Sequence, residues 1–206
     1  VSPTASSSAA YQALIDSGIA VVAIDRKLSN LTIDTVSVEN RCATERVVSH
    51  LIAMGHTRIA AVVGTPDVST GIERRQGYEE ALRAHGLSVD PRLICSGVPQ
   101  IPTGYELTNQ LLALPNPPTA IFTGNNLLTI GALRAIHEHG LTVPHDIAVA
   151  AFDEMDWMFV MNPPLTVVAQ PSYAMGEHAA TLLLQRIEDP DRAIAAIELE
   201  PIVHLR

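Results

Sequence analysis

Short apolar runs alternate along the chain with longer segments in which apolar positions recur at helical spacing. The runs are mostly β-branched, which is typical of strands buried on both faces of a parallel sheet. They are Ala20–Ile24, Thr35–Val38, Ile59–Val63, Leu93–Cys95, Ala120–Thr123, Ile147–Ala151 and Thr166–Ala169. The segments that predict helices are Ala9–Asp16, Arg41–Met54, Ile72–Ala84, Gly104–Ala113, Leu127–His139 and Tyr173–Ile187. This alternation predicts the α/β class, with parallel sheets flanked by helices.

Two local patterns refine the helices. Three of them end at a glycine followed by a short polar link, and glycine readily takes the left-handed conformation that ends a helix. These glycines are Gly55, Gly86 and Gly140. The helix Arg41–Met54 carries its apolar residues at helical spacing on one face. We expect its polar face to consist of Thr44, Glu45 and Ser49.

The composition is that of an acidic globular chain. Of the 206 residues 47% are apolar, and 13 lysines and arginines stand against 22 aspartates and glutamates, for a formal net charge of -9. That charge disfavours binding to the phosphate backbone of DNA. The longest apolar runs are far shorter than the roughly 20 residues that cross a bilayer, so we expect no membrane span.

The termini and cysteines indicate where the chain works. No secretory signal is visible, and Cys42 and Cys95 lack a C-x-x-C spacing, so we expect free thiols in a reducing, cytoplasmic compartment. Val1–Pro3 resembles the tail of a strand, and a sheet needs several strands to cover its helices. We therefore expect the chain to begin partway through a domain.

Polar residues directly follow most of the predicted strands. In open α/β sheets, ligands bind beyond the carboxyl ends of the strands. The residues there are Asp25, Arg26, Gly64, Thr65, Ser96, Gly97, Gly124, Asn125, Asn126, Asp153, Glu154 and Gln170. The set contains both donors and acceptors and therefore suits a sugar or another polyol, whose hydroxyls do both. The alternative is that these side chains only cap helices and stabilise turns.

Sequence motifs of common enzymes are absent. The chain has no G-x-x-x-x-G-K-[ST] loop, no G-x-G-x-x-G after a strand, no G-x-S-x-G and no H-E-x-x-H. His137 and His139 lie two residues apart on a predicted helix and so diverge, which argues against a metal site. The carboxylates Asp153, Glu154 and Asp156 have no histidine or cysteine near them in sequence. We expect no catalytic residue, no metal and no cofactor.

Six motifs follow one another along the chain. They are Leu51–Ala60, Arg74–Tyr78, Pro118–Phe122, Ile130–Ala135, Val143–Val149 with Phe152–Asp153, and Pro164–Val168 with Gln170–Pro171. In this order they resemble the effector-binding core of the LacI/GalR family of bacterial transcription repressors, over essentially the whole chain. The resemblance implies two Rossmann-like lobes, as in periplasmic sugar-binding proteins, joined by three chain crossovers with a small-molecule effector in the cleft between them.

The resemblance also implies a division of the chain and an assembly. Residues 1–38 and 170–190 would form the first lobe, which is incomplete here, and residues 39–169 and 191–206 the second. The family's N-terminal helix-turn-helix headpiece is absent from this chain, so DNA would be bound only through that missing part. A homodimer is implied, with apolar residues of Met155–Met161 and of the helix Ile72–Ala84 as expected contacts.

The family's effector contacts carry over to five positions. They are Asp25, Arg74, Asn125, Asp153 and Gln170. By resemblance Asp25 is an acidic contact from the first lobe, and Arg74 grips effector hydroxyls or carboxylates. Asn125 and Asp153 are contacts from the second lobe, and Gln170 lies beside a crossover. The chain has Asn126, Ala151 and Pro99 where the family usually has an aspartate, a glycine and, in several members, an aromatic residue.

These expectations describe the sensing core of a dimeric, cytoplasmic transcription regulator that is not an enzyme and responds to a sugar or a related polar metabolite. Two rival functions remain. One is a periplasmic sugar-binding protein of a transport system, which a signal peptide in a full-length sequence would support. The other is an α/β enzyme that uses Asp153 and Glu154, which turnover of a bound sugar would support.

Overall fold

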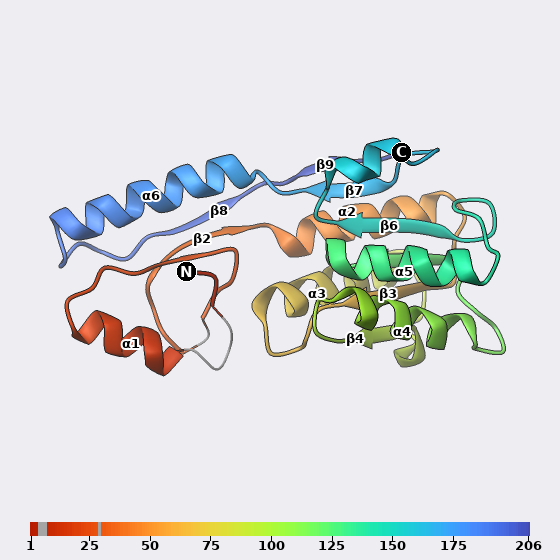
Figure 1. Ribbon diagram of the computed structural model, residues 1–206, viewed down its shortest axis with the longest axis horizontal. Helices are drawn as coiled ribbons and strands as arrows, with labels where there is room; N and C mark the ends of the chain where they lie inside the picture. The colour runs from red at the N-terminus through yellow and green to blue at the C-terminus, as the bar shows by residue number, and fades with distance from the viewer. Residues whose placement is uncertain (4–7, 29) are drawn as a thin grey trace. The chain divides into compact units, whose positions relative to one another are not determined.

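The computed structural model describes residues 1–3, 8–28 and 30–206, which form two compact units. The first consists of Val1–Glu39, Asp67–Thr70 and Pro171–Pro201. The second consists of Asn40–Pro66, Gly71–Gln170 and Ile202–Arg206. Both have the predicted α/β construction, with strands that pair mainly in parallel and helices packed against the sheets (Figure 1).

The first unit is built on a three-stranded parallel sheet. Its strands, in spatial order, are β1 (Val22–Ile24), β2 (Asp34–Val38) and β8 (Ala196–Leu199). The helix α6 (Ser172–Glu188) packs against β1 and β2, and α1 (Ser8–Asp16) precedes β1 (Figure 1). Apolar side chains from the sheet and α6 form the core; they include Val22, Val36, Val38, Met175 and Leu182.

The outer edge of β1 is paired as well. The N-terminal ammonium group of Val1 donates a hydrogen bond to the carbonyl of Val22, and the N–H of Ile24 donates one to the carbonyl of Val1, both at 2.8 Å. Val1 therefore hydrogen-bonds to β1 as a residue of a neighbouring strand does.

The second unit is built on a six-stranded sheet. Its spatial order is β4 (Ile94–Ser96), β3 (Ile59–Val63), β5 (Ala120–Thr123), β6 (Ala148–Phe152), β7 (Thr166–Ala169) and β9 (Ile202–His204). Neighbouring strands pair in parallel, except that β9 is antiparallel to β7. The helices are α2 (Asn40–Ala53), α3 (Ser69–Ala84), α4 (Ile101–Leu112) and α5 (Asn126–Glu138), with 3-10 turns η2 (Pro91–Leu93) and η3 (Asp156–Val160).

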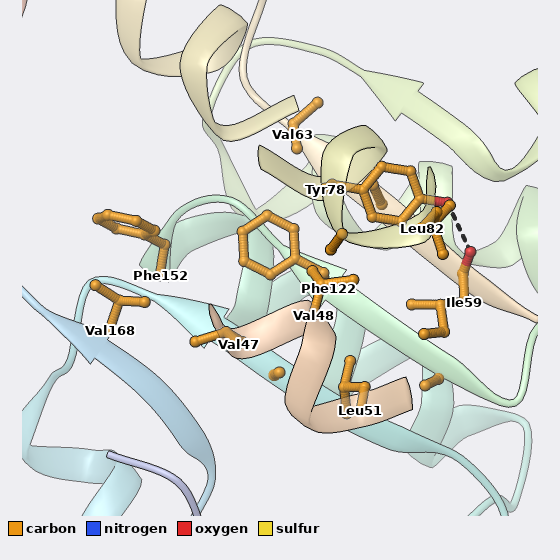
Figure 2. Close-up of a cluster of buried hydrophobic side chains, with 14 of the residues drawn as sticks. Val47, Val48, Leu51, Ile59, Val63, Tyr78, Leu82, Phe122, Phe152 and Val168 are labelled. Carbon is orange, nitrogen blue, oxygen red and sulfur yellow. Dashed lines mark hydrogen bonds between the residues drawn. The ribbon is translucent and has the colours of Figure 1, made fainter. Parts of the chain in front are cut away.

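Helices cover both faces of this sheet. On one face, α2 and α3 pack against the strands through Val47, Leu51 and Leu82, with Phe122 of β5 in the same cluster (Figure 2). Tyr78 of α3 is fully buried there, and its hydroxyl donates to the carbonyl of Ile59 at 2.8 Å. On the other face, α4 and α5 cover a second cluster that includes Leu111, Leu128, Ile136 and Val149.

Two sequence expectations need correction. Residues 191–206 were expected in the second lobe, but the structure divides them, because β8 pairs with β2 in the first unit and β9 pairs with β7 in the second. Thr44 was expected on the polar face of its helix, yet it is completely buried. Its hydroxyl has no hydrogen-bond partner among the described residues.

The glycine helix ends are confirmed. Gly55, Gly86 and Gly140 have φ angles of 96°, 70° and 73°, the left-handed values that follow a helix. Another glycine, Gly131, lets α4 and α5 approach closely, since an added Cβ there would lie 2.2 Å from the carbonyl oxygen of Ile101. No side chain fits at that distance, so this helix pair depends on the glycine.

Candidate functional site

Polar side chains gather at the carboxyl ends of three neighbouring strands of the second unit. Asn125 lies beyond β5, Asp153 directly follows β6 and Gln170 directly follows β7. Arg74 reaches the same place from α3. Because parallel strands end at one edge of a sheet, four of the five residues predicted as effector contacts lie together. The fifth, Asp25, lies in the first unit.

Asp153 is the centre of this cluster. Asn125 Nδ2 donates to one carboxylate oxygen at 2.9 Å, and Gln170 Nε2 donates to the other at 2.5 Å. Arg74 Nη1 lies 3.6 Å from the same carboxylate. The backbone of Asp153 has a φ of 71°, and its N–H donates to the carbonyl of Val168. Two amides, one arginine and the backbone therefore fix where this carboxylate points.

Arg74 is a buried cation with several partners. Only 4% of the residue is exposed. Its Nε donates to Asn40 Oδ1 at 2.8 Å, and its Nη1 donates to the carbonyl of Gly124 at 2.6 Å. The guanidinium also lies over the ring of Phe152, 3.6 Å from the ring centre, in a cation–π contact. These partners fix the position and orientation of the guanidinium plane in the absence of a ligand.

Asn40 and Phe152 are functional candidates that the sequence did not indicate as such. Asn40 is 1% exposed and joins Arg74 to Glu73, since its Nδ2 donates to Glu73 Oε2 at 2.9 Å. It lies just beyond β2, at the start of α2. Its position just after a strand, where a polar residue can face a ligand, was the sequence signal that could have identified Asn40. Phe152 ends a buried strand and gave no signal beyond its apolar character.

Asn125 has a second task that sets its orientation. It is the residue before α5, and its side-chain oxygen accepts from the N–H of Leu127 at 2.9 Å. An amide whose oxygen caps a helix presents its NH₂ group in the other direction. Asn125 therefore donates to Asp153 and cannot offer it an oxygen without giving up the cap.

Asp25 repeats part of this design in the first unit. It follows β1, has a φ of 69°, and its N–H donates to the carbonyl of Val36 at 2.8 Å. Its carboxylate lies 3.7 Å from Arg26 Nε. In both units a left-handed aspartate thus follows a strand and hydrogen-bonds across to the next one, and Asp and Asn tolerate this conformation better than most residues do.

The remaining carboxylates are not arranged for acid–base chemistry with Asp153. Glu154 Oε1 accepts from Arg206 at 3.0 Å, and Glu154 Oε2 lies 3.5 Å from His204 Nε2. Asp156 is exposed on η3. Among the residues that the structure describes, no three histidines, cysteines, aspartates or glutamates are grouped to hold a metal ion. The site is therefore an array of hydrogen-bond donors and acceptors around one ion pair.

The two cysteines agree with the sequence analysis. Cys42 is exposed and Cys95 is partly buried, and both are free thiols. Burial raises the pKa of the Cys95 thiol above its ordinary value. Within the described part of the chain, no helix is both long and apolar enough to cross a bilayer.

Comparison with known sequences finds a family and its curated members. The periplasmic binding protein-like domain family matches residues 48–206. The HTH-type transcriptional repressor CytR of Escherichia coli K12 is 38% identical over 158 residues, which cover 77% of this chain and 46% of CytR. The probable HTH-type transcriptional regulator EndR of Paenibacillus polymyxa is 32% identical over 99% of this chain and 62% of EndR. The chain thus spans about half to three fifths of these relatives.

Solved structures agree with the sequence matches. A LacI-family regulatory protein from Chloroflexus aggregans superposes with a TM-score of 0.85 and 32% identity, over 95% of this chain and 70% of that one. The regulator CelR in complex with cellobiose superposes with a TM-score of 0.89 and 32% identity, over 95% of this chain and 61% of CelR. A LacI-family regulator from Enterococcus faecium with bound ribose superposes with a TM-score of 0.85 and 27% identity, over 98% of this chain and 75% of that one. Sequence and fold together show that the chain belongs to the LacI family of transcription regulators, with the periplasmic-binding-protein-like fold of their cores.

Proposed function

We propose that this chain is the effector-sensing core of a DNA-binding transcription regulator and that the effector is a sugar or a related polar metabolite. The observation that carries the proposal is the cluster of Arg74, Asn125, Asp153 and Gln170 at the carboxyl edge of the second unit. Its arginine and its carboxylate supply a donor and an acceptor side by side, the pair that a hydroxyl group needs.

The family membership supports this function over its rivals. The named relatives are transcriptional repressors and regulators, and two solved neighbours hold cellobiose and ribose. A transport protein or a sugar-processing enzyme would be an exception among them. A regulator of this kind works where the DNA is, in the cytoplasm. Asp25 stays a prediction as an effector contact from the first unit.

DNA binding belongs to a separate headpiece in this proposal. The net charge of -9 repels the phosphate backbone, and the described surface pairs most of its arginines with carboxylates. The effector acts by binding one conformational state better than another, which shifts their populations and changes the DNA affinity of the whole protein.

We also propose that the regulator is a homodimer, which matches the two half-sites of a palindromic operator. The second unit exposes apolar side chains on and beside η3: Met155 is 41% exposed, Phe159 56% and Val160 85%. Ile72 of α3 is 39% exposed. A group of exposed apolar side chains close together in one segment is typical of a protein–protein interface.

Calorimetric titration with D-ribose and cellobiose tests the effector proposal. We expect heat of binding from at least one of the two sugars, and loss of about 10- to 100-fold in affinity for Asp153→Ala, because hydrogen bonds to a charged group contribute about 1.5–3 kcal/mol. Asp156→Ala, the same change on an exposed carboxylate three residues away, is the matched control. Equal affinities of the two variants would contradict the assignment of the site.

A further inference from the structure

We infer that the cluster around Asp153 selects uncharged polyols and rejects the carboxylate and phosphate forms of the same sugars. The inference rests on the proposed effector-binding function and narrows its ligand class. Family resemblance alone leaves both classes open, since an arginine can bind either hydroxyls or carboxylates. The charges and hydrogen bonds of the site decide between them.

The first observation concerns the supply of positive charge. The chain has one lysine, Lys27, and twelve arginines. At least twelve of these thirteen cations lie within 4.0 Å of an aspartate or glutamate oxygen. Arg46 lies in the middle of α2, away from both carboxyl edges. A cation whose charge is not already balanced would attract an anionic ligand most strongly, and Arg26, Lys27 and Arg74 at the two carboxyl edges each have a carboxylate within 4.0 Å.

The second observation is that the ion pair between Arg74 and Asp153, which balances the charge of the arginine, is largely buried. The side chains of Arg74 and Asp153 are 5% and 18% exposed, so water screens their interaction poorly. The cation is further stabilised by the Phe152 ring and by the carbonyl of Gly124. An anionic ligand at this arginine would meet an ion pair with no net positive charge, so it would gain little attraction to offset the loss of its own hydration.

The third observation concerns the neutral donors. The amides of Asn125 and Gln170 could serve an anion as donors, but both already donate to Asp153. The helix cap formed by the Asn125 oxygen holds that arrangement in place. The donors near Asp153 therefore stabilise the protein's own carboxylate instead of a ligand's.

Hydroxyl groups fit what remains. A hydroxyl accepts from an arginine N–H and at the same time donates its proton to a carboxylate, so it can sit between Arg74 and Asp153. A ligand carboxylate or phosphate dianion only accepts, and no proton would separate its oxygen from those of Asp153. The site thus pairs well with neighbouring hydroxyls and poorly with an anion of the same size.

Matched ligand pairs test the selectivity by calorimetry. The pairs are D-ribose with D-ribose 5-phosphate, and cellobiose with its uronic acid, in which one CH₂OH becomes a carboxylate. We expect each anion to bind about 100-fold or more weakly than its neutral parent. An anion that binds as tightly as its parent would overturn the inference.

A charge-removing variant tests the cause. In Asp153→Asn the arginine loses its counter-charge while the residue keeps a type that tolerates left-handed backbone. We expect its preference for the neutral ligand over the anionic one to shrink by about tenfold or more. Glu154→Gln is the matched control, because it removes one charge from the next residue, whose partners are Arg206 and His204. A shift of equal size in both variants would refute a local cause.

Inorganic phosphate provides a readout that needs no sugar. The Nε–H resonance of Arg74, observed by nitrogen-15 NMR, should not move when millimolar phosphate is added to the wild-type chain, and should move in Asp153→Asn. A phosphate response of the wild-type resonance would overturn the inference even if sugars bind. If no sugar binds while phosphate behaves as expected, the proposed effector function fails, and only the rejection of anions by the Arg74–Asp153 pair stands.

Discussion

The guanidinium of Arg74 lies 3.6 Å from the centre of the Phe152 ring, so the buried cation rests on the residue that directly precedes Asp153. A strand end thereby supplies both a flat support for the arginine and the carboxylate beside it. Lysine could keep the charge at this position but not the planar stacking or the fixed fork of N–H donors.

Arg74→Lys should therefore weaken effector binding without unfolding the chain. The ammonium group cannot donate to Asn40 and Gly124 in the geometry of the guanidinium, so we expect a loss of about 10- to 100-fold in affinity for the sugar that binds the wild type, measured by calorimetry. Arg75→Lys is the control, because Arg75 is exposed and pairs with Glu79. Equal losses in both variants would show that Arg74 has no special part.

Asn40 should act on binding through Arg74. Asn40→Ala removes the acceptor of the Arg74 Nε–H, and we expect about a fivefold loss of sugar affinity, as for a hydrogen bond that contributes about 1 kcal/mol. Asn40→Asp keeps an acceptor oxygen for Arg74 but places a carboxylate where the amide now donates to Glu73, so we expect it to recover only part of the affinity. If Asn40→Ala lowered thermal stability but left affinity unchanged, Asn40 would be a scaffold residue only.

Asp34 should control the stability of the first unit. Its carboxylate is 1% exposed and accepts from Arg186, Arg192 and the N–H of Ala195. Asp34→Asn leaves two arginines facing a neutral group, and we expect a loss of about 3 kcal/mol. Hydrogen-exchange protection of β2 and β8 measures it. Asp191→Asn, on an exposed residue, should change little.

The same carboxylate predicts a pH dependence. Burial alone would raise the pKa of Asp34, but the hydrogen bonds from Arg186 and Ala195 and the charges of Arg186 and Arg192 outweigh burial and lower it. A carboxyl with a lowered pKa stabilises the fold above its unfolded pKa, and that contribution disappears as the pH falls below about 4. Protection of β2 should therefore decrease from about pH 4 downward in the wild type, and less steeply in Asp34→Asn.

Two buried hydroxyls should be dispensable. Thr44 and Thr108 are fully buried, and neither hydroxyl has a hydrogen-bond partner among the described residues. Thr44→Val and Thr108→Val replace an unsatisfied polar group with a methyl group of similar size, so we expect each to stabilise by about 1 kcal/mol. Urea denaturation followed by the fluorescence of Trp157, the single tryptophan, measures this in the second unit.

Thr129→Val is the counterpart of these variants. The Thr129 hydroxyl donates to the carbonyl of Asn125 at 2.8 Å and lies 2.8 Å from the hydroxyl of Thr123. Its loss should destabilise by about 1 kcal/mol, which is opposite in sign. If all three threonine-to-valine changes were destabilising, the fit of the side chain, and not the hydrogen bond of the hydroxyl, would determine their effect on stability.

Val160 should be needed for the proposed dimer. Val160→Asp places a charge on the 85% exposed side chain of η3, and we expect the mass in solution at micromolar concentration to fall from that of a dimer to that of a monomer. Val98→Asp makes the same change on another exposed valine and should leave the mass unchanged. Light scattering distinguishes the two masses, and a wild-type monomer would contradict the assembly.

The sequence predicted the elements that carry a strong apolar signal. Seven strands, of which only β4 lacks a buried residue, and the glycine ends of three helices were found because short apolar runs and Gly55, Gly86 and Gly140 each have one dominant structural meaning. The strands β8 and β9 were not among the predicted runs. Residues of β8 are alternately exposed and half-buried, and Pro201 separates the two strands, so neither forms a continuous apolar run.

The site divides in the same way. The gathering of Asn125, Asp153 and Gln170 follows from the rule that parallel strands end at one edge, which a sequence pattern can supply. The hydrogen bond from Arg74 to Asn40 and its cation–π contact with Phe152 depend on how the start of α2 and the end of β6 pack against α3. Such packing is set by tertiary contacts between segments far apart in sequence, and no local pattern encodes it.

The pairing of β2 with β8 has a consequence for synthesis on the ribosome. The ribosome delivers β1 and β2 before all the parallel strands of the second sheet, and only afterwards α6 and β8. Until then Val36 and Val38 lack the side chains of Met175 and Leu182 that cover them in the finished core. Pairings between distant segments form slowly and leave apolar surface open to aggregation. During synthesis the first unit therefore keeps apolar surface open until α6 and β8 emerge, and that surface is one to which chaperones can bind.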